Sequence, residues 1–244
     1  MSGPLDRPGA AGALPWAVYL FDVDGTLLSA GGAGRRAFER AVGDHCGPLD
    51  GALAGLRLDG MTDRLIVRET LRLLGRPFED AFCDALLARY VEHLRTEIHR
   101  PGFEVLPGVV EVLEGLRARQ ALLALCTGNV VEGARLKLSR GSLDGYFEWD
   151  ASAVYGFAGD GEDRVHVVQA ALRRAAARLG RAVAPAEALV IGDTPRDIAA
   201  AHAVGIPVLG VATGRYGVED LRRAGAEHVA ASLADGAARG VLFG

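Results

Sequence analysis

Long apolar runs are missing from this sequence of 244 residues, and so is any excess of positive charge. No stretch approaches the roughly 18 uninterrupted apolar residues that a membrane-spanning helix requires, which excludes membrane proteins of that class. The formal net charge of −4 at pH 7 disfavours nucleic acid and anionic membranes as partners, because both attract a basic face. Half of the residues are hydrophobic, as expected for a globular protein with a folded core.

Cysteine and lysine are also scarce. The three cysteines, Cys46, Cys83 and Cys126, are odd in number and widely spaced, and they match neither a metal site nor a redox motif. We therefore expect buried free thiols in a reducing cytoplasm. Lys137 is the only lysine among the 27 basic residues, so one position has kept the compact, flexible ammonium group.

The pattern of the chain changes after its first residues. Residues 1–15 are rich in Gly, Ala and Pro and lack the basic start and the continuous apolar run of a secretory signal, so we expect a disordered segment. Beyond it, short apolar runs alternate with helical patterns, which predicts an α/β fold with a Rossmann-like, mainly parallel sheet. The clearest predicted strands are residues 17–21, 122–126, 188–191 and 208–211, with weaker ones at 147–154 and 227–231.

A block of different character follows the first predicted strand. From residue 33 to 99 the apolar residues recur at helical spacing and no strand-like run interrupts them. A glycine-rich stretch at 31–34 precedes the block, and Pro-Gly pairs at 101–102 and 107–108 follow it, as hinges would. We therefore predict a helical cap domain at residues 32–103, inserted into an α/β core domain formed by residues 16–31 and 104–244.

Acidic residues stand where the first predicted strand ends. Asp22 and Asp24 are separated by one residue, and Gly25 allows the chain to turn sharply behind them. Acids are poor strand formers, so a strand that runs into two of them is unusual. In an open parallel sheet, ligands bind beyond the carboxyl ends of the strands. Either acid alone is equally well explained as an N-cap or turn residue.

Two further strands end in polar groups. The strand at 122–126 runs into Thr127 at the start of a helical segment, where a hydroxyl and free backbone amides can bind phosphate, although a plain N-cap is the simpler explanation. The strand at 188–191 leads to Asp193, and Asp197 follows four residues later, on the same side if the turn is helical. A helix cap would need only one of these acids.

The combination of these strand ends is more informative than any one of them. Together they bring Asp22, Asp24, Asp193 and Asp197 into one small volume at the edge of the predicted sheet. Four like charges repel one another strongly at low dielectric unless a cation lies among them. Several carboxylate oxygens form the ligand set that suits Mg²⁺ best. The sequence therefore predicts a magnesium site.

With these residues the chain resembles the haloacid dehalogenase superfamily of aspartate-nucleophile phosphotransferases, over nearly its whole length. The motif DVDGTL at residues 22–27 is the most specific element, GDTPRD at 192–197 is nearly as specific, and TGN at 127–129 lies between them in the expected order. The helical insert is similar to the family's type 1 cap, as in phosphoglycolate phosphatases and β-phosphoglucomutases.

The resemblance implies a role for each acid. Asp22 would attack phosphorus and form an aspartyl-phosphate, while Asp24 would protonate the leaving oxygen and later take a proton from water. Asp22, the backbone carbonyl of Asp24, and Asp193 would hold Mg²⁺, with Asp197 supporting the metal directly or through water. A dianionic phosphate repels a carboxylate nucleophile, so the site must supply positive charge before attack.

Phosphate binding and charge balance are implied as well. Thr127 and the backbone amides of Gly128 and Asn129 would bind the transferring phosphoryl group. The family usually places a Lys-Pro pair downstream of this motif, but this chain has Arg164 there and no lysine. Lys137 lies ten residues after Thr127 on the helix that begins at the phosphate site, within reach because helical side chains lean toward the N-terminus. We expect Lys137 to be the charge-balancing cation, with Arg164 as its rival or co-worker and a surface position as the alternative.

The cap offers candidates for substrate binding. Residues 60–64 (GMTDR) resemble the Gly-x-Thr-Asp segment of phosphoglycolate phosphatase-like caps, which implies that Thr62 and Asp63 face the substrate. Either residue can also be the N-cap of the following helix. Further possible contacts, or solvated surface groups, are Arg35, Arg36 and His45.

These features predict a cytoplasmic, Mg²⁺-dependent phosphatase, monomeric or homodimeric, that hydrolyses a small phosphate monoester such as phosphoglycolate or a sugar phosphate. A phosphosugar mutase of the β-phosphoglucomutase type is the alternative, because it also needs Asp24. Haloacid dehalogenation is disfavoured because those enzymes replace this second aspartate, and Schiff-base phosphonate cleavage is disfavoured because the cap has no lysine. A non-catalytic binding protein of the same fold is a third hypothesis, which the complete set of motifs disfavours.

Overall fold

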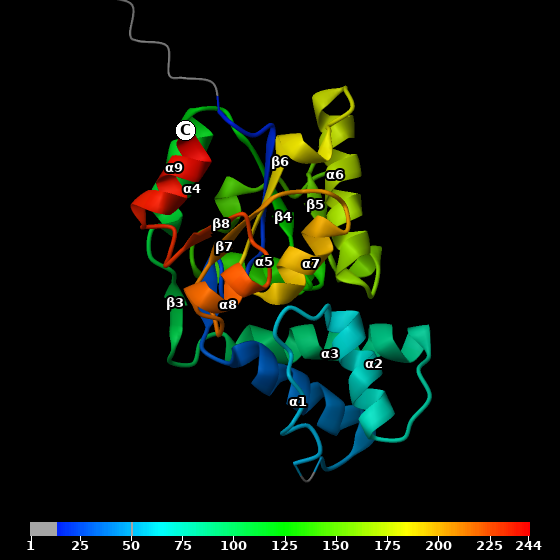
Figure 1. The fold of residues 1–244 in the computed structure, drawn as a ribbon. Helices are drawn as coiled ribbons and strands as arrows, with labels where there is room; N and C mark the ends of the chain where they lie inside the picture. Colours follow the sequence, from blue (N-terminus) through cyan, green and yellow to red (C-terminus); the bar gives the residue numbers. More distant parts are fainter. Residues whose placement is uncertain (1–13, 50) are drawn as a thin grey trace, which may run out of the picture.

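The computed structural model of this chain describes residues 14–49 and 51–244. Figure 1 shows an α/β body built on a central sheet, with a group of helices beyond one edge of that sheet. Of the segment predicted to be disordered, residues 1–13 lie outside the described ranges. Within those ranges, no helix is long and apolar enough to cross a membrane.

Six parallel strands form the central sheet, which confirms the predicted α/β fold. They are β1 (Val18–Phe21), β4 (Leu122–Cys126), β5 (Tyr155–Gly156), β6 (Ala188–Gly192), β7 (Val208–Val211) and β8 (His228–Ala230), in the spatial order β5-β4-β1-β6-β7-β8. β1 pairs with β4 on one side and with β6 on the other. The ends of the three strands that carry the predicted chemistry are therefore neighbours.

Helices cover both faces of the sheet. On one face lie α4 (Val109–Ala118), α5 (Val131–Arg140) and α9 (Gly236–Phe243); on the other lie α6 (Arg164–Leu179), α7 (Pro195–His202) and α8 (Val218–Arg223). Successive β1 residues point to opposite faces, so Tyr19 and Phe21 join the first hydrophobic cluster while Val18 and Leu20 join the second. Burial on both sides explains why these strands are apolar throughout.

The remaining helices form a third layer with a core of its own. They are α1 (Ala33–Cys46), α2 (Asp63–Leu73) and α3 (Asp80–Glu97), and they share a separate hydrophobic cluster that includes Phe38, Leu86 and Leu94. The chain leaves and re-enters the α/β body through an antiparallel pair, β2 (Leu28–Ala30) and β3 (Phe103–Val105). This arrangement supports our proposal that residues 32–103 form a cap domain, which Figure 1 shows below the sheet.

Two local features differ from the sequence prediction. The strand predicted at residues 147–154 is wrong in position, because the chain there forms a turn in which Asp150 Oδ1 accepts a hydrogen bond from Ser152 N, and the strand follows at β5. The β2–β3 pair was not predicted, since three-residue strands carry too little alternation to be recognised. The three cysteines are free thiols, as predicted; Cys83 and Cys126 are buried, but the prediction of burial is wrong for Cys46, which is partly exposed.

Candidate active site

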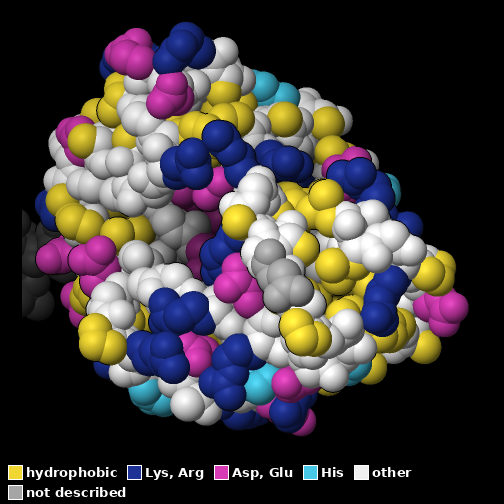
Figure 2. All heavy atoms as spheres, turned by 90° about the horizontal axis from the view of Figure 1, so that it is seen from below, with side chains coloured by type: hydrophobic (Ala, Val, Ile, Leu, Met, Phe, Trp, Pro, Cys, Tyr) yellow, Lys and Arg dark blue, Asp and Glu magenta, His cyan; other side chains and the backbone are white. Residues whose placement is uncertain are grey.

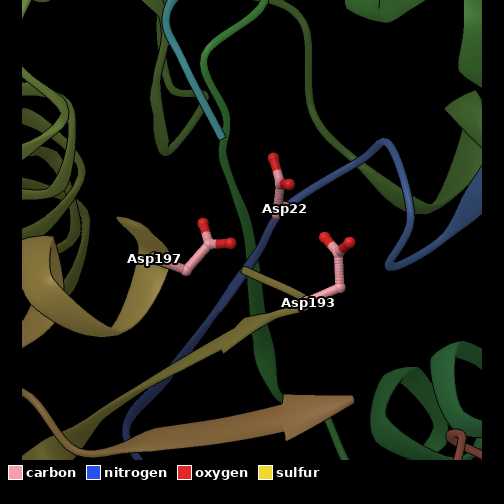
Figure 3. Close-up of side chains that lie close together, drawn as sticks. All are labelled: Asp22, Asp193 and Asp197. Atoms are coloured by element: carbon pink, nitrogen blue, oxygen red, sulfur yellow. The ribbon is translucent and has the colours of Figure 1, made fainter. Parts of the chain in front are cut away.

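Three carboxylates converge at the carboxyl edge of the sheet. Asp22 follows β1 directly and its backbone N–H donates to Ile191 O at 2.9 Å, which aligns the ends of β1 and β6. Asp193 follows β6, and Asp197 lies in the first turn of α7. Figure 3 shows the three side chains close together, with their carboxyl groups turned to the same side. Each offers one oxygen within 4.8 Å of the other two, and all three are buried.

Burial gives these acids unusual electrostatics. Desolvation raises the pKa of Asp22 to about 6, although the Arg164 guanidinium opposes this, and the neighbouring Asp197 and Asp24 charges add to the rise. Desolvation, together with Asp197 and Asp22, also raises the pKa of Asp193 well above its ordinary value. Like charges confined in a dry pocket are stable only with compensating cations.

The cluster fits a divalent ion. Opposite ligands of an octahedral Mg²⁺ lie roughly 4.2 Å apart, so a small contraction brings one oxygen from each carboxylate onto a single ion. Glycines leave the space around Asp193 open, because a Cβ at Gly25 would stand 2.3 Å from Asp193 Oδ2 and one at Gly214 only 1.8 Å from it. The three carboxylates offer oxygen ligands, the chemistry that suits Mg²⁺. Asp24, the fourth acid predicted for the metal, is not part of this group, because its carboxylate contacts Lys137 and Asn129 instead.

The Asp24 carboxylate belongs to a second cluster, beside the first. Lys137 Nζ lies 2.6 Å from Asp24 Oδ2 and also donates to Asn129 Oδ1 at 2.6 Å. Asn129 Nδ2 donates to Asp24 Oδ2 at 2.8 Å and to Thr127 Oγ1 at 2.8 Å. The Lys137 side chain is 5% exposed and the Asp24 side chain 42% exposed, so the acid faces the open space while the cation beside it is buried. Burial lowers the pKa of Lys137, but Asp24, Tyr90 and Asp63 together outweigh this, so the pKa is raised and the ammonium stays charged.

Arg164 is the cation of the first cluster. It is the first residue of α6, and its Nη2 lies 3.0 Å from Asp22 Oδ1 and in contact with Asp197 Oδ1. Its Nη1 donates to Gly60 O in the loop before α2 at 3.2 Å. The structure thus brings both predicted cations into the site, Lys137 beside Asp24 and Arg164 beside Asp22 and Asp197. Lys137 reaches Asp24 from two turns along α5, which is the geometry expected of its helix position.

The cap contributes Thr62 and Asp63, which contact loops of the α/β body. Thr62 is the N-cap of α2, accepting from Leu65 N at 3.2 Å, and its hydroxyl donates to Glu162 O at 2.7 Å. Asp63 Oδ2 accepts from Val130 N at 2.7 Å. Burial raises the pKa of Asp63 to about 6, with Lys137 opposing the rise. Both residues therefore join the cap to the α/β body.

The other cap candidates serve the cap itself. Arg35 Nη1 and Nη2 donate to Leu56 O and Leu53 O, so this side chain holds the loop that follows α1, although it also lines the cleft. Arg36 pairs with Glu97 at 2.8 Å. His45 hydrogen-bonds Ala41 O and packs edge-on against Phe82.

A cleft of about 920 Å³ opens between the cap and the edge of the sheet. Its lining includes Asp22 and Asp193 of the first cluster and the whole of the second. The loop that follows β7 and cap side chains such as Phe38, Ile66 and Tyr90 complete it. Figure 2, which views the molecule from the cap side, shows a hollow bordered by acidic and basic side chains. The site is therefore deep and charged at its base and apolar in part of its cap wall.

Sequence reasoning missed the loop after β7 and Tyr90. Thr213 Oγ1 donates to Gly25 O at 2.6 Å and so fixes the turn behind the two first acids, while Gly214 leaves room for Asp193. The strand-end rule that found Asp22 and Asp193 also applies to the strand at 208–211 and could have found these residues. Tyr90 lies within a regular helical pattern, and nothing in that pattern distinguishes it from a core residue.

Known proteins resemble this chain over most of its length. The profile of the haloacid dehalogenase-like hydrolases matches residues 16–205. The phosphoglycolate phosphatase of Rhodospirillum rubrum is 34% identical over 219 residues, covering 87% of this chain and 86% of that protein. A Dickeya dadantii protein named "Probable phosphatase IndB" is 28% identical over 218 residues, covering 85% of this chain and 86% of that protein. The crystal structure of a hydrolase from Pseudomonas syringae superimposes with a TM-score of 0.67 at 25% identity, covering 90% of this chain and 95% of that hydrolase.

Proposed function

The chain belongs to the haloacid dehalogenase-like hydrolase family and is a phosphoric monoester hydrolase similar to phosphoglycolate phosphatases, and from this premise we propose that it hydrolyses small phosphate monoesters with Mg²⁺ and the Asp22 carboxylate. One observation carries the proposal. Asp22, Asp193 and Asp197 come from separate elements and present one oxygen each within 4.8 Å of the others. Arg164 offsets only part of the charge of these three acids, and the pKa values of Asp22 and Asp193 remain raised beside it, which favours a further cation. Asp22 and Asp193 line a cleft wide enough for a small metabolite.

Asp22 is the proposed nucleophile. One of its oxygens attacks phosphorus while the bond from phosphorus to the leaving oxygen breaks, which gives an aspartyl-phosphate and an alcohol. Arg164, 3.0 Å from Asp22 Oδ1, holds the carboxylate in place. Bound Mg²⁺, held by Asp22, Asp193, Asp197 and the Asp24 carbonyl, would supply positive charge that offsets the repulsion between the carboxylate and the dianionic phosphate.

Asp24 is the proposed acid and base. It gives a proton to the leaving oxygen in the first step, and the resulting carboxylate takes a proton from the water that attacks the aspartyl-phosphate in the second. The second step breaks the bond between Asp22 and phosphorus, releases inorganic phosphate and restores both acids. Lys137 and Asn129 both contact Oδ2 of Asp24, and their bonds orient the carboxyl toward the cleft.

The residues at 127–129 are proposed to bind the phosphoryl group. Thr127 is fully buried next to Asp22, and the backbone amides of Gly128 and Asn129 follow it at the approach to α5. A hydroxyl and consecutive amides near a helix start are suited to phosphate oxygens. The cap at residues 32–103 would close the cleft over the leaving group and exclude water.

The direct test is phosphate release from p-nitrophenyl phosphate with and without Mg²⁺. Removal of the metal with EDTA should lower turnover by about 100-fold or more, and added Mg²⁺ should restore it. Equal rates with and without the metal would contradict the proposal. A phosphate-release panel of phosphoglycolate, sugar phosphates and nucleotides would then identify the substrate, and formation of an isomer from a sugar phosphate, without phosphate release, would identify a mutase instead.

The affinity for Mg²⁺ should depend on pH. The pKa of Asp22 is raised to about 6 and that of Asp193 is raised as well, so protons compete with the metal for these oxygens below neutrality. We therefore expect the apparent dissociation constant for Mg²⁺ to fall as the pH rises from 5 to 7, because the acids lose their protons. A titration of the metal-induced rise in melting temperature at several pH values measures this without substrate. A constant affinity across that range would contradict it.

The two cations should be separable by mutation. Lys137→Ala and Arg164→Ala should each lower kcat by about 100-fold, because each removes one fixed positive group from the site. Arg164→Ala should also strengthen Mg²⁺ binding, since it removes a positive charge from beside two of the metal's acids, whereas Lys137→Ala should leave that affinity unchanged. Arg173→Ala is the control: it removes an exposed arginine from α6, the helix of Arg164, and should change neither kcat nor the affinity for Mg²⁺. Near-normal turnover of Lys137→Ala beside an inactive Arg164→Ala would assign charge balance to Arg164 alone.

A further inference from the structure

Asp63 connects the cap to the segment that is proposed to bind phosphate. Its backbone N–H donates to Gly128 O at 2.7 Å, and its side-chain Oδ2 accepts from Val130 N at 2.7 Å. Gly128 permits this approach, because a Cβ there would stand 2.3 Å from Met61 O. Asp63 thus hydrogen-bonds two peptide groups of the α/β body, the one before Asn129 and the one after it.

These two bonds fix the orientation of both peptide groups. A trans peptide group is planar, and its carbonyl and N–H point in opposite directions. Because Gly128 O faces Asp63, the N–H of Asn129 must point away from the cap, where Thr127 Oγ1 lies 3.4 Å from it. Because Val130 N–H also faces Asp63, Asn129 O must point the other way, and it accepts from Ala158 N at 2.9 Å. The backbone of Asn129 is therefore held from both sides.

The Asn129 side chain connects this fixed backbone to the proposed reacting groups by hydrogen bonds. Its Nδ2 bonds both Asp24 Oδ2 and Thr127 Oγ1 at 2.8 Å, and its Oδ1 accepts from Lys137 Nζ at 2.6 Å. Rotation of either neighbouring peptide group would displace this side chain. The proposed acid, the phosphate-binding hydroxyl and one cation would lose a common partner.

Val130 also needs an acceptor from elsewhere. It is the N-cap of α5, and its own backbone N–H precedes the helix, where no carbonyl of the helix can accept from it. The Asp63 carboxylate provides an acceptor at this helix end, from a residue 67 positions earlier in the chain. When the cap moves away, this bond and the bond to Gly128 are lost together.

We propose that Asp63 is a positioning residue, which acts through the two peptide groups around Asn129 and aligns Asp24, Thr127 and Lys137 only when the cap is seated. The inference rests on the proposed function, and it differs from the substrate contact that the family resemblance implies for Asp63. A substrate contact would discriminate among leaving groups. A positioning residue affects every substrate alike, because it acts on the catalytic groups themselves.

Kinetics of two variants test this role. Asp63→Ala should lower kcat by about 10- to 100-fold with KM changed by no more than about twofold, and by the same factor for alkyl phosphates of different shape. Asp63→Asn keeps an oxygen that can accept from Val130 N, so it should restore most of the turnover. A loss of activity confined to one substrate, or seen mainly in KM, would overturn the proposal, as would an Asp63→Asn variant as impaired as Asp63→Ala.

Amide hydrogen exchange gives a readout that needs no activity. The Val130 amide should exchange about tenfold faster or more in Asp63→Ala than in the wild type, and stay protected in Asp63→Asn. Asp84→Ala, which removes an exposed acid from the same cap, should leave this amide unchanged. If Asp63→Ala folds poorly, Asp63→Ser can replace it. The serine hydroxyl is one bond closer to the backbone than the carboxylate oxygens and does not reach Val130 N, so the Val130 amide should again exchange faster. Unchanged protection in the alanine or serine variant would overturn the proposal, whereas an inactive wild type with the expected exchange pattern would overturn the proposed function instead.

Discussion

Asp22→Asn is expected to abolish turnover, with kcat reduced by a factor on the order of 10⁴ or more. The substitution keeps nearly the same volume at the end of β1 and removes the oxygen anion that would bond to phosphorus. It also removes one of the three acids proposed to hold Mg²⁺. Hydrolysis of p-nitrophenyl phosphate by the purified variant, followed to long times and high enzyme concentration, measures the residual rate.

The fold of this variant should remain intact. Asp22 is buried with a pKa raised to about 6, above the ordinary value of 3.8, so its charged form destabilises the metal-free protein. That destabilisation is absent below about pH 4 and grows as the pH rises through 6. At pH 8 without metal, Asp22→Asn should therefore melt no lower than the wild type. Substantial activity in a folded Asp22→Asn variant would be incompatible with covalent catalysis by this residue.

The arrangement of the sheet and its acids could be predicted because local rules determine it. A buried parallel strand must be apolar, so Asp22 and Asp193 mark the points where β1 and β6 end. Parallel strands place their carboxyl ends along one edge, and the pairing of β1 with β6 then makes these two acids neighbours. For Lys137 the family resemblance implied a charge-balancing cation, and helix geometry showed that an ammonium group ten residues after Thr127 could reach the site.

What could not be predicted depends on contacts between the cap and the α/β body. The bonds of Asp63 to Gly128 and Val130 join segments more than sixty residues apart, and no periodicity in either segment encodes them. The sequence leaves open whether Arg164 is a rival or a co-worker of Lys137, because it gives no sign that Asp22 and Asp24 face different cations. The placement of Tyr90 in the cleft likewise depends on how α3 packs over the site. Tertiary packing determines these contacts, and the local sequence pattern does not encode them.

Asp24→Asn should separate the two chemical steps. Both contacts of the Asp24 carboxylate, from Lys137 and Asn129, go to Oδ2, and an asparagine keeps an acceptor for them while losing the ability to transfer a proton. For alkyl phosphates, whose leaving oxygen must be protonated, kcat should fall by about 10²- to 10⁴-fold. p-Nitrophenolate leaves without protonation, so this substrate should still phosphorylate Asp22.

The second step would remain slow for every substrate, because no base is left to take a proton from water. Asp24→Asn should therefore release about one equivalent of nitrophenolate per enzyme in a rapid burst, followed by a slow steady rate as the aspartyl-phosphate accumulates. Rapid-mixing absorbance measures the burst, and intact-protein mass spectrometry after acid quench detects the phosphoenzyme. The double variant with Asp22→Asn is the matched control and should show no burst. A residue that serves first as acid and then as base slows the first step only for alkyl phosphates and the second step for every substrate. A linear time course from the first turnover, with equal losses of kcat for alkyl and aryl phosphates, would therefore show that Asp24 does not act in both steps.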